Sequence, residues 1–258
     1  MVPNVIWNMR YLRHLYMCGH KTLACLQFDT LEHLQTLSEV HVNSWKQNNS
    51  TKLVSLRKLG IRGNLSSDTR AFFKSLAALP QLQSLNLHAE DAEFPSLAQL
   101  ASLHSLVKLH LSGRIPLFPM PEEFPPTLSQ LTLEFSRLEQ KSIDILAKLP
   151  RLETLRLKAQ SYREADLTIS VNGFAQLEFL EFNSLDSLQN FNVEGDAIPR
   201  LRNFRIANCK GLIMLPAGMK NVTSLHELEV EEMPKVFVDR LRGDDFHKVQ
   251  HISSLTFI

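Results

Sequence analysis

The chain has 258 residues, a formal net charge of +1, 44% hydrophobic residues and 21% charged residues. This composition is that of a globular protein and excludes a disordered chain, and the near-neutral charge does not indicate a nucleic-acid-binding protein. No apolar run reaches the roughly 18 residues of a membrane span, and the start of the chain lacks the apolar stretch of a secretory signal. The three cysteines are too scattered for a disulfide framework. We therefore expect a cytoplasmic protein with no membrane span and no nucleic-acid partner.

A single apolar pattern, apolar-x-x-apolar-x-x-apolar-x-apolar, recurs along the whole chain, and 44 of the residues are leucine. The ten intervals between successive third positions average 24 residues, which lies within the range of leucine-rich repeats. The third apolar position of each copy is occupied by Leu15, Val40, Leu59, Leu85, Leu109, Leu131, Leu155, Leu180, Phe204, Leu228 and Leu255.

Each copy ends in two apolar residues with one residue between them. This spacing of two residues is the period of a short strand in which alternate side chains are buried. One copy cannot bury its leucines alone, so neighbouring copies must stack. The sequence therefore predicts an α/β solenoid, a leucine-rich-repeat horseshoe with a concave parallel β-sheet of about eleven short strands and a mostly irregular convex side. We expect residues 1–258 to form one such domain, with the first repeat truncated at its start.

Four connecting segments give a local signal, in chain order. Residues 45–52 (WKQNNSTK) form the most polar stretch and predict a loop. Asp68 and Thr69, followed by residues 70–77, predict a capped short helix. Residues 115–126 contain five prolines and no period, which predicts an extended loop. Residues 141–148 (KSIDILAK) predict a second short helix on the convex side.

Motifs for catalysis or cofactor binding are missing from the sequence. It contains no phosphate-binding glycine loop and no nucleophile elbow or zinc-protease helix. The densest group of metal-ligand types is His14, Cys18, His20 and Cys25, but His14 and Cys18 alternate with apolar residues of the first predicted strand. Because structural zinc needs four convergent ligands, we expect no metal site. Since the sequence motifs for catalysis and cofactor binding are missing, we also expect no cofactor and no enzymatic activity.

The solvent-facing side of the predicted sheet is the candidate binding surface, because solenoids of this kind bind partners over their extended concave face. Charge is uneven along it: residues 1–62 carry 8 basic and 3 acidic side chains, whereas residues 222–258 carry 4 and 7. Such polarity can orient a protein partner. The partner-binding candidates on this face are Tyr16, His41, Lys58, Arg62, His88, Lys108, His110, Arg156, Lys158, Phe179, Arg205, Glu227, Glu229 and Glu231.

Three segments carry a more specific resemblance. Residues 6–15 (IWNMRYLRHL) resemble a motif of coiled-coil-type plant nucleotide-binding leucine-rich-repeat disease-resistance proteins. Residues 225–234 (LHELEVEEMP) and 249–252 (VQHI) are similar to the closing repeats of the same family. The chain departs from the repeat pattern of this family at one position. The asparagine or cysteine that follows each strand in the family is present here only at Asn64 and Cys209, which predicts local irregularity of the backbone after the other strands.

The resemblance implies an intracellular plant immune receptor. Its repeats would sense a pathogen effector or a guarded, modified host protein and would restrain an adjacent nucleotide-binding switch, which this chain lacks. The partners would be that protein and the nucleotide-binding domain of the same or a longer receptor chain, so that residues 1–42 would be covered by this domain or by further repeats. Two alternatives stay open: the ligand-binding ectodomain of a cell-surface leucine-rich-repeat receptor, suggested once by residues 113–116 (GRIP), and a generic intracellular leucine-rich-repeat scaffold.

Overall fold

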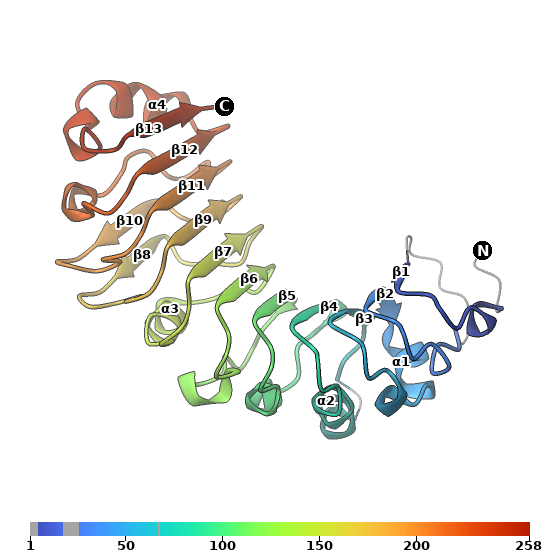
Figure 1. The fold of residues 1–258 in the computed structure, drawn as a ribbon. Coiled ribbons are helices and arrows are strands. Elements are labelled where there is room, and N and C mark those ends of the chain that lie inside the picture. The colour runs from blue at the N-terminus through green and yellow to red at the C-terminus, as the bar shows by residue number, and fades with distance from the viewer. Residues whose placement is uncertain (1–4, 18–25, 67) are drawn as a thin grey trace. The chain divides into compact units, whose positions relative to one another are not determined.

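A computed structural model describes residues 5–17, 26–66 and 68–258 of the chain. It divides into two compact units, residues 1–128 (unit 1) and residues 129–258 (unit 2). In each unit short parallel strands lie side by side in chain order, and helical turns and loops connect them (Figure 1).

Most strands of unit 1 pair in the register that the repeat predicts, but the second copy does not. Leu37, rather than the expected Val40, lies opposite Leu15 and Leu59, and an irregularity between Leu37 and Val40 shifts Val40 opposite Ile61. Leu59 of one strand lies opposite Leu85 of the next, which lies opposite Leu109, and all three side chains are buried. The described strands are β1 (His14–Tyr16), β2 (Thr36–His41), β3 (Lys58–Gly63), β4 (Ser84–Glu93) and β5 (Lys108–Arg114). The connecting helices are η1 (Ile6–Asn8), α1 (Val42–Gln47), η2 (Ser50–Lys52), α2 (Thr69–Ala77), η3 (Ala98–Ser102) and η4 (Pro121–Glu123).

Helix α2 confirms the predicted capped helix, since the Asp68 side chain accepts a hydrogen bond from the backbone N–H of Ala71. The loop predicted at residues 45–52 is wrong, because helices α1 and η2 occupy this stretch. Trp45 is buried against Phe28, with ring centroids 6.0 Å apart, and its indole donates to Ser75 Oγ at 2.8 Å. One buried tryptophan thus anchors a segment whose other side chains are mostly polar.

Unit 2 contains six parallel strands that follow the repeat and a second, two-stranded parallel sheet. The six are β6 (Gln130–Glu134), β7 (Thr154–Lys158), β9 (Phe179–Asn183), β11 (Asn203–Ala207), β12 (Glu227–Glu231) and β13 (Ser254–Phe257). The second sheet pairs β8 (Asp166–Ile169) with β10 (Asn190–Val193). The helices of this unit are α3 (Gln140–Leu146), η5 (Ala217–Asn221), α4 (Lys235–Arg242) and η6 (Phe246–Lys248).

The repeat therefore predicted the number of repeat strands correctly, although it misaligned the second copy: in the described part of the chain, five repeat strands lie in unit 1 and six in unit 2. Helix α3 confirms the second predicted helix to within two residues. Strands β8 and β10 and helix α4 were not predicted. The two strands have their own period of two, with Leu167, Ile169, Phe191 and Val193 all buried.

The core of unit 2 joins its two sheets through aromatic rings. Phe182 of β9 is fully buried and meets Phe204 of β11 and Phe191 of β10, with ring centroids 5.4 and 5.1 Å apart. Both contacts are edge-to-face, the geometry that aromatic pairs prefer. Phe182 thus packs against both the next repeat strand and the second sheet.

Gly218 in η5 marks a close approach between neighbouring repeats. A Cβ atom at this position would lie 2.0 Å from the carbonyl oxygen of Val193. Since that atom belongs to the backbone of β10, Gly218→Ala should lower the free energy of unfolding by about 2 kcal/mol through overpacking. Urea denaturation followed by circular dichroism measures this. The exposed neighbour Asn221 is the control: its change to alanine should stay within about 0.5 kcal/mol, and equal losses for both variants would contradict the steric argument.

Candidate protein-recognition surface

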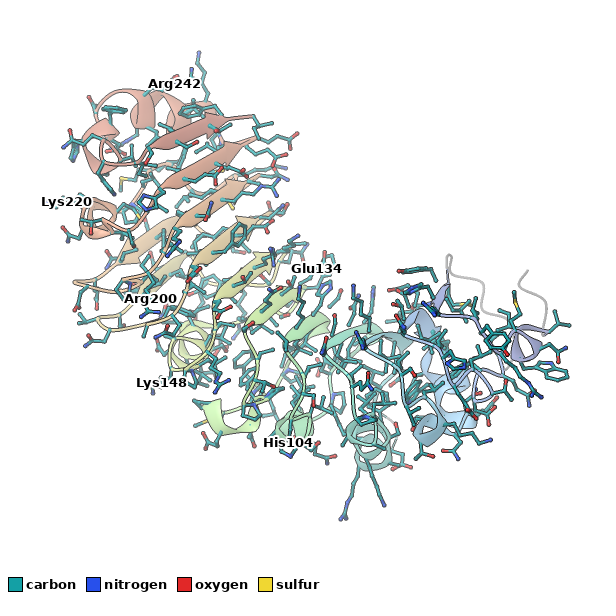
Figure 2. The ribbon with its side chains drawn as sticks, viewed as in Figure 1. His104, Glu134, Lys148, Arg200, Lys220 and Arg242 are labelled. Carbon is teal, nitrogen blue, oxygen red and sulfur yellow. The ribbon has the colours of Figure 1, made fainter. Side chains whose placement is uncertain are left out.

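The side chains that alternate with the buried leucines form the solvent-facing side of each unit's repeat strands, called here the sheet face. All seven unit 2 candidates lie on it and are half-buried: Arg156, Lys158, Phe179, Arg205, Glu227, Glu229 and Glu231. Other cations of this unit, among them Lys148, Arg200 and Lys220, belong instead to the segments that connect the strands (Figure 2). The charged side chains on the sheet face of unit 2 therefore belong to residues of the repeat strands.

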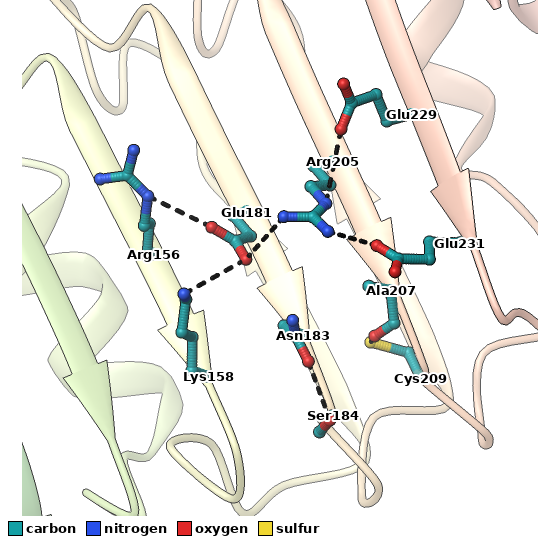
Figure 3. A network of polar contacts seen from close by, with 10 residues as sticks. All are labelled: Arg156, Lys158, Glu181, Asn183, Ser184, Arg205, Ala207, Cys209, Glu229 and Glu231. Atoms are coloured by element: carbon teal, nitrogen blue, oxygen red, sulfur yellow. Dashed lines mark hydrogen bonds and ion pairs between the residues drawn. The ribbon is translucent and has the colours of Figure 1, made fainter. Parts of the chain in front are cut away.

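Four neighbouring strands of unit 2 place alternating charges in one row. Arg156 of β7 lies opposite Glu181 of β9, Glu181 lies opposite Arg205 of β11, and Arg205 lies opposite Glu229 of β12. Directly opposed residues on neighbouring strands are within reach of each other, so unlike charges in one row attract. We call this set, together with Lys158 and Glu231, the charge row (Figure 3).

Glu181 is the centre of the charge row. Its side chain is only 2% exposed, and three cations surround it: Arg156 Nε at 3.2 Å, Lys158 Nζ at 3.6 Å and Arg205 Nη1 at 3.7 Å. The cations remain about a third exposed, at 33, 34 and 33%. A buried carboxylate is costly unless it is paired, and here the cations supply the pairing while their outer edges still face solvent.

Arg205 links the basic and acidic ends of the charge row. Its Nε lies 3.4 Å from Glu229 Oε2, and its Nη2 donates a hydrogen bond to Glu231 Oε2. This hydrogen bond is the main reason why the pKa of the Arg205 guanidinium lies above its ordinary value. Among the candidates found in the sequence, Arg205 thus contacts the acidic Glu229 and Glu231 directly, so the basic and acidic candidates form one network.

An aromatic ring borders the charge row. The Arg156 guanidinium carbon lies 4.7 Å from the centroid of the Phe179 ring, the arrangement of a cation–π contact. Glu181 was not among the partner-binding candidates. Its signal was in the sequence, since Arg156, Glu181 and Arg205 hold the same position in three successive repeats.

Six of the seven candidates in unit 1 have side chains that reach solvent on its sheet face: Tyr16, His41, Lys58, His88, Lys108 and His110. Arg62 differs, because it is only 7% exposed. Its Nη1 lies 2.7 Å from Glu90 Oε1, and its Nε donates to the carbonyl of Glu39. The expectation of an exposed basic spot at Arg62 is therefore wrong: the guanidinium holds the carboxyl ends of neighbouring strands together.

The candidate metal ligands near the start of the chain and the buried Cys209 are separate features. Cys18, His20 and Cys25 lie outside the described residues, and His14 Nδ1 lies 3.1 Å from Thr36 Oγ1. In the described ranges no group of three or more metal-ligand side chains converges. Cys209 is buried, and burial raises the pKa of its thiol to about 11, which makes it a packing residue rather than a reactive one.

Comparison with known proteins agrees with the leucine-rich repeat of the sequence. The family described as "Leucine-rich repeat region" matches residues 1–236. The chain belongs to this family. Among the described residues no helix is both long and apolar enough to cross a membrane.

The relatives of this leucine-rich-repeat chain include plant disease-resistance proteins. It is 34% identical over its whole length to the probable disease resistance RPP8-like protein 2 of Arabidopsis thaliana and 30% identical to the disease resistance protein RPP8 of the same plant. It spans 29% of the length of each. Among solved structures, an internalin from Listeria monocytogenes is 15% identical, with 98% of this chain and 88% of the internalin covered and a TM-score of 0.43.

Proposed function

We propose that this chain is the non-catalytic recognition region of a plant disease-resistance protein that acts in the cytoplasm. Residues 1–258 serve as one leucine-rich-repeat domain that senses a pathogen effector or a modified host protein. The same domain restrains a nucleotide-binding switch in a longer receptor chain. The family match and the relatives named as disease-resistance proteins support the recognition role.

The observation that carries the proposal is the charge row of unit 2. Its side chains are held by one another, with Glu181 in contact with three cations and Arg205 in contact with two further carboxylates. Side chains that are already ordered lose less conformational freedom when a partner binds. An alternating row of charge also discriminates between partners, because like charges brought together cost several kcal/mol. The row is therefore suited to specific recognition of a protein surface.

The test reverses one charge of this row. Glu229 is 37% exposed, so Glu229→Lys changes the row without burying a new charge. We expect biotin-ligase fusions expressed in pathogen-treated leaves to label at least one protein about five-fold less with this variant than with the unaltered chain, the loss expected from one partly exposed ion pair. Glu194→Lys is the matched control, since Glu194 is exposed and follows β10, away from the repeat strands.

A protein that meets this criterion is then purified and titrated against the three chains. Equal labelling of every protein by all three would contradict recognition through the charge row.

The proposed restraint of the nucleotide-binding switch is measured in the same leaves by ion leakage. RPP8 lacking its matching segment is expressed with and without this chain, and unchanged leakage would contradict the proposed restraint.

A further inference from the structure

The sheet face of unit 1 carries a cationic row with a different design from the charge row of unit 2. One register position crosses all five strands and holds His14, Thr36, Lys58, Ser84 and Lys108. None of these five side chains is acidic or apolar. We call this set the cationic row. His14, Lys58 and Lys108 are exposed, whereas Thr36 is buried and its hydroxyl lies 3.1 Å from the His14 ring.

The two lysines are available to a partner. Within the described residues, no ion pair or hydrogen bond engages the ammonium groups of Lys58 and Lys108. Carboxylates at the end of β4 are engaged elsewhere, since Glu90 pairs with Arg62 at 2.7 Å and Glu93 pairs with Arg114 at 2.5 Å. Arg156, Lys158 and Arg205 of unit 2, by contrast, all surround Glu181. Unit 1 therefore presents cations whose charge has not been neutralised within the face.

The spacing of the cationic row selects the shape of its ligand. His14 and Lys58 lie two strands apart, and so do Lys58 and Lys108. Two strand spacings measure about 10 Å. One turn of an extended segment in the polyproline II conformation, three residues, spans about 9 Å and brings every third side chain to the same side. An extended segment that crosses the strands can therefore place one carboxylate at His14, one at Lys58 and one at Lys108.

We propose that the cationic row binds an extended acidic segment of the recognised protein, with a carboxylate at every third residue. The inference rests on the proposed recognition role and names the chemistry of the partner. The next row holds Tyr16, Ser38, Gly60, Asn86 and His110. A protein ligand suits the cationic row better than a single-stranded nucleic acid, because the aromatic rings stand only at the two ends and the three central positions are Ser38, Gly60 and Asn86. These offer no aromatic platform for base stacking.

The test uses two labelled nine-residue peptides of serine and threonine that differ only in the order of their residues. One has glutamate at positions 1, 4 and 7, and the other has three adjacent glutamates. In fluorescence anisotropy at low salt, the spaced peptide should bind the 258-residue chain at least about five-fold more tightly, since only it reaches His14, Lys58 and Lys108 at once. The difference should shrink as salt is added, because the charges are exposed.

Variants locate the site. Lys58→Glu with Lys108→Glu should weaken binding of the spaced peptide at least about ten-fold. The matched control, Lys74→Glu with Lys148→Glu, makes the same change in net charge at two exposed lysines of the connecting segments and should leave the affinity within two-fold. Circular dichroism checks that each variant is folded. If the double glutamate variant unfolds, Lys58→Gln with Lys108→Gln replaces it.

Three results would overturn the proposal: equal affinity for the two peptides, equal losses in the row and control variants, or tighter binding of a single-stranded oligonucleotide than of the spaced peptide. The assay is separable from the leaf experiment, which changes Glu229 in unit 2. Failure of the peptide to bind would leave recognition through the charge row standing. Failure of the leaf experiment with success of the peptide would assign recognition to unit 1 instead.

Discussion

Phe182→Ala should lower the free energy of unfolding of the chain by about 4 kcal/mol, the loss typical of a large buried ring. Phe182 is fully buried, and its ring meets Phe204 in the repeat sheet and Phe191 in the second sheet. The change therefore removes apolar contacts on two sides and leaves a cavity that the two sheets cannot both close.

Chemical denaturation measured by tryptophan fluorescence and circular dichroism tests this expectation. Phe182→Leu keeps most of the volume and should cost about 1 kcal/mol. Phe135→Ala is the surface control, because the Phe135 side chain is 44% exposed and should contribute far less. A loss for Phe182→Ala no larger than that for Phe135→Ala would show that the ring does not join the two sheets.

Reversing Arg156 and Lys158 to glutamate should destabilise the chain by about 3 kcal/mol, the order found when a buried charge loses its partners. Glu181 would keep only Arg205 at 3.7 Å, and two new carboxylates would face its 2% exposed side chain. Attraction within the charge row would thus become repulsion around a carboxylate that water reaches poorly. The double reversal is therefore unsuited to testing recognition alone, which is why Glu229 was chosen for that purpose.

The companion variant Glu181→Gln separates the two contributions. It removes the buried charge, keeps the side-chain shape and leaves three cations that are about a third exposed and can be hydrated. We expect it to cost less than about 1 kcal/mol, since the lost attraction is offset by the lost desolvation penalty. Thermal and urea unfolding of both variants provide the measurement. A double reversal no more costly than Glu181→Gln would mean that the cations do not stabilise the buried carboxylate.

Much of the surface could be predicted from the repeat, because register follows from spacing wherever the strands are regular. The second copy is the exception, since a backbone irregularity after Leu37 places Val40 opposite Ile61 instead of Leu59. With a repeat near 24 residues, Arg156, Glu181 and Arg205 must occupy equivalent strand positions, and the same logic aligns Lys58 with Lys108. Thirteen of the fourteen candidate side chains are exposed or half-buried on the sheet faces. What spacing could not give is the pairing within a row, which depends on side-chain length and direction. Arg62 illustrates this, since it turns to Glu90 and is buried.

The sequence by itself determined the leucine-rich repeat, the number and direction of its strands and the residues that could face solvent. These follow from a local rule: side chains alternate along a strand, and each copy needs a neighbour to cover its leucines. Only the tertiary structure decided the helix around Trp45, the sheet of β8 and β10 and the burial of Glu181. Each depends on contacts between residues at least 20 positions apart, such as Trp45 with Ser75, Leu167 with Phe191 and Glu181 with Arg205. No pattern within one repeat records such contacts, because their energy arises only when neighbouring repeats are stacked.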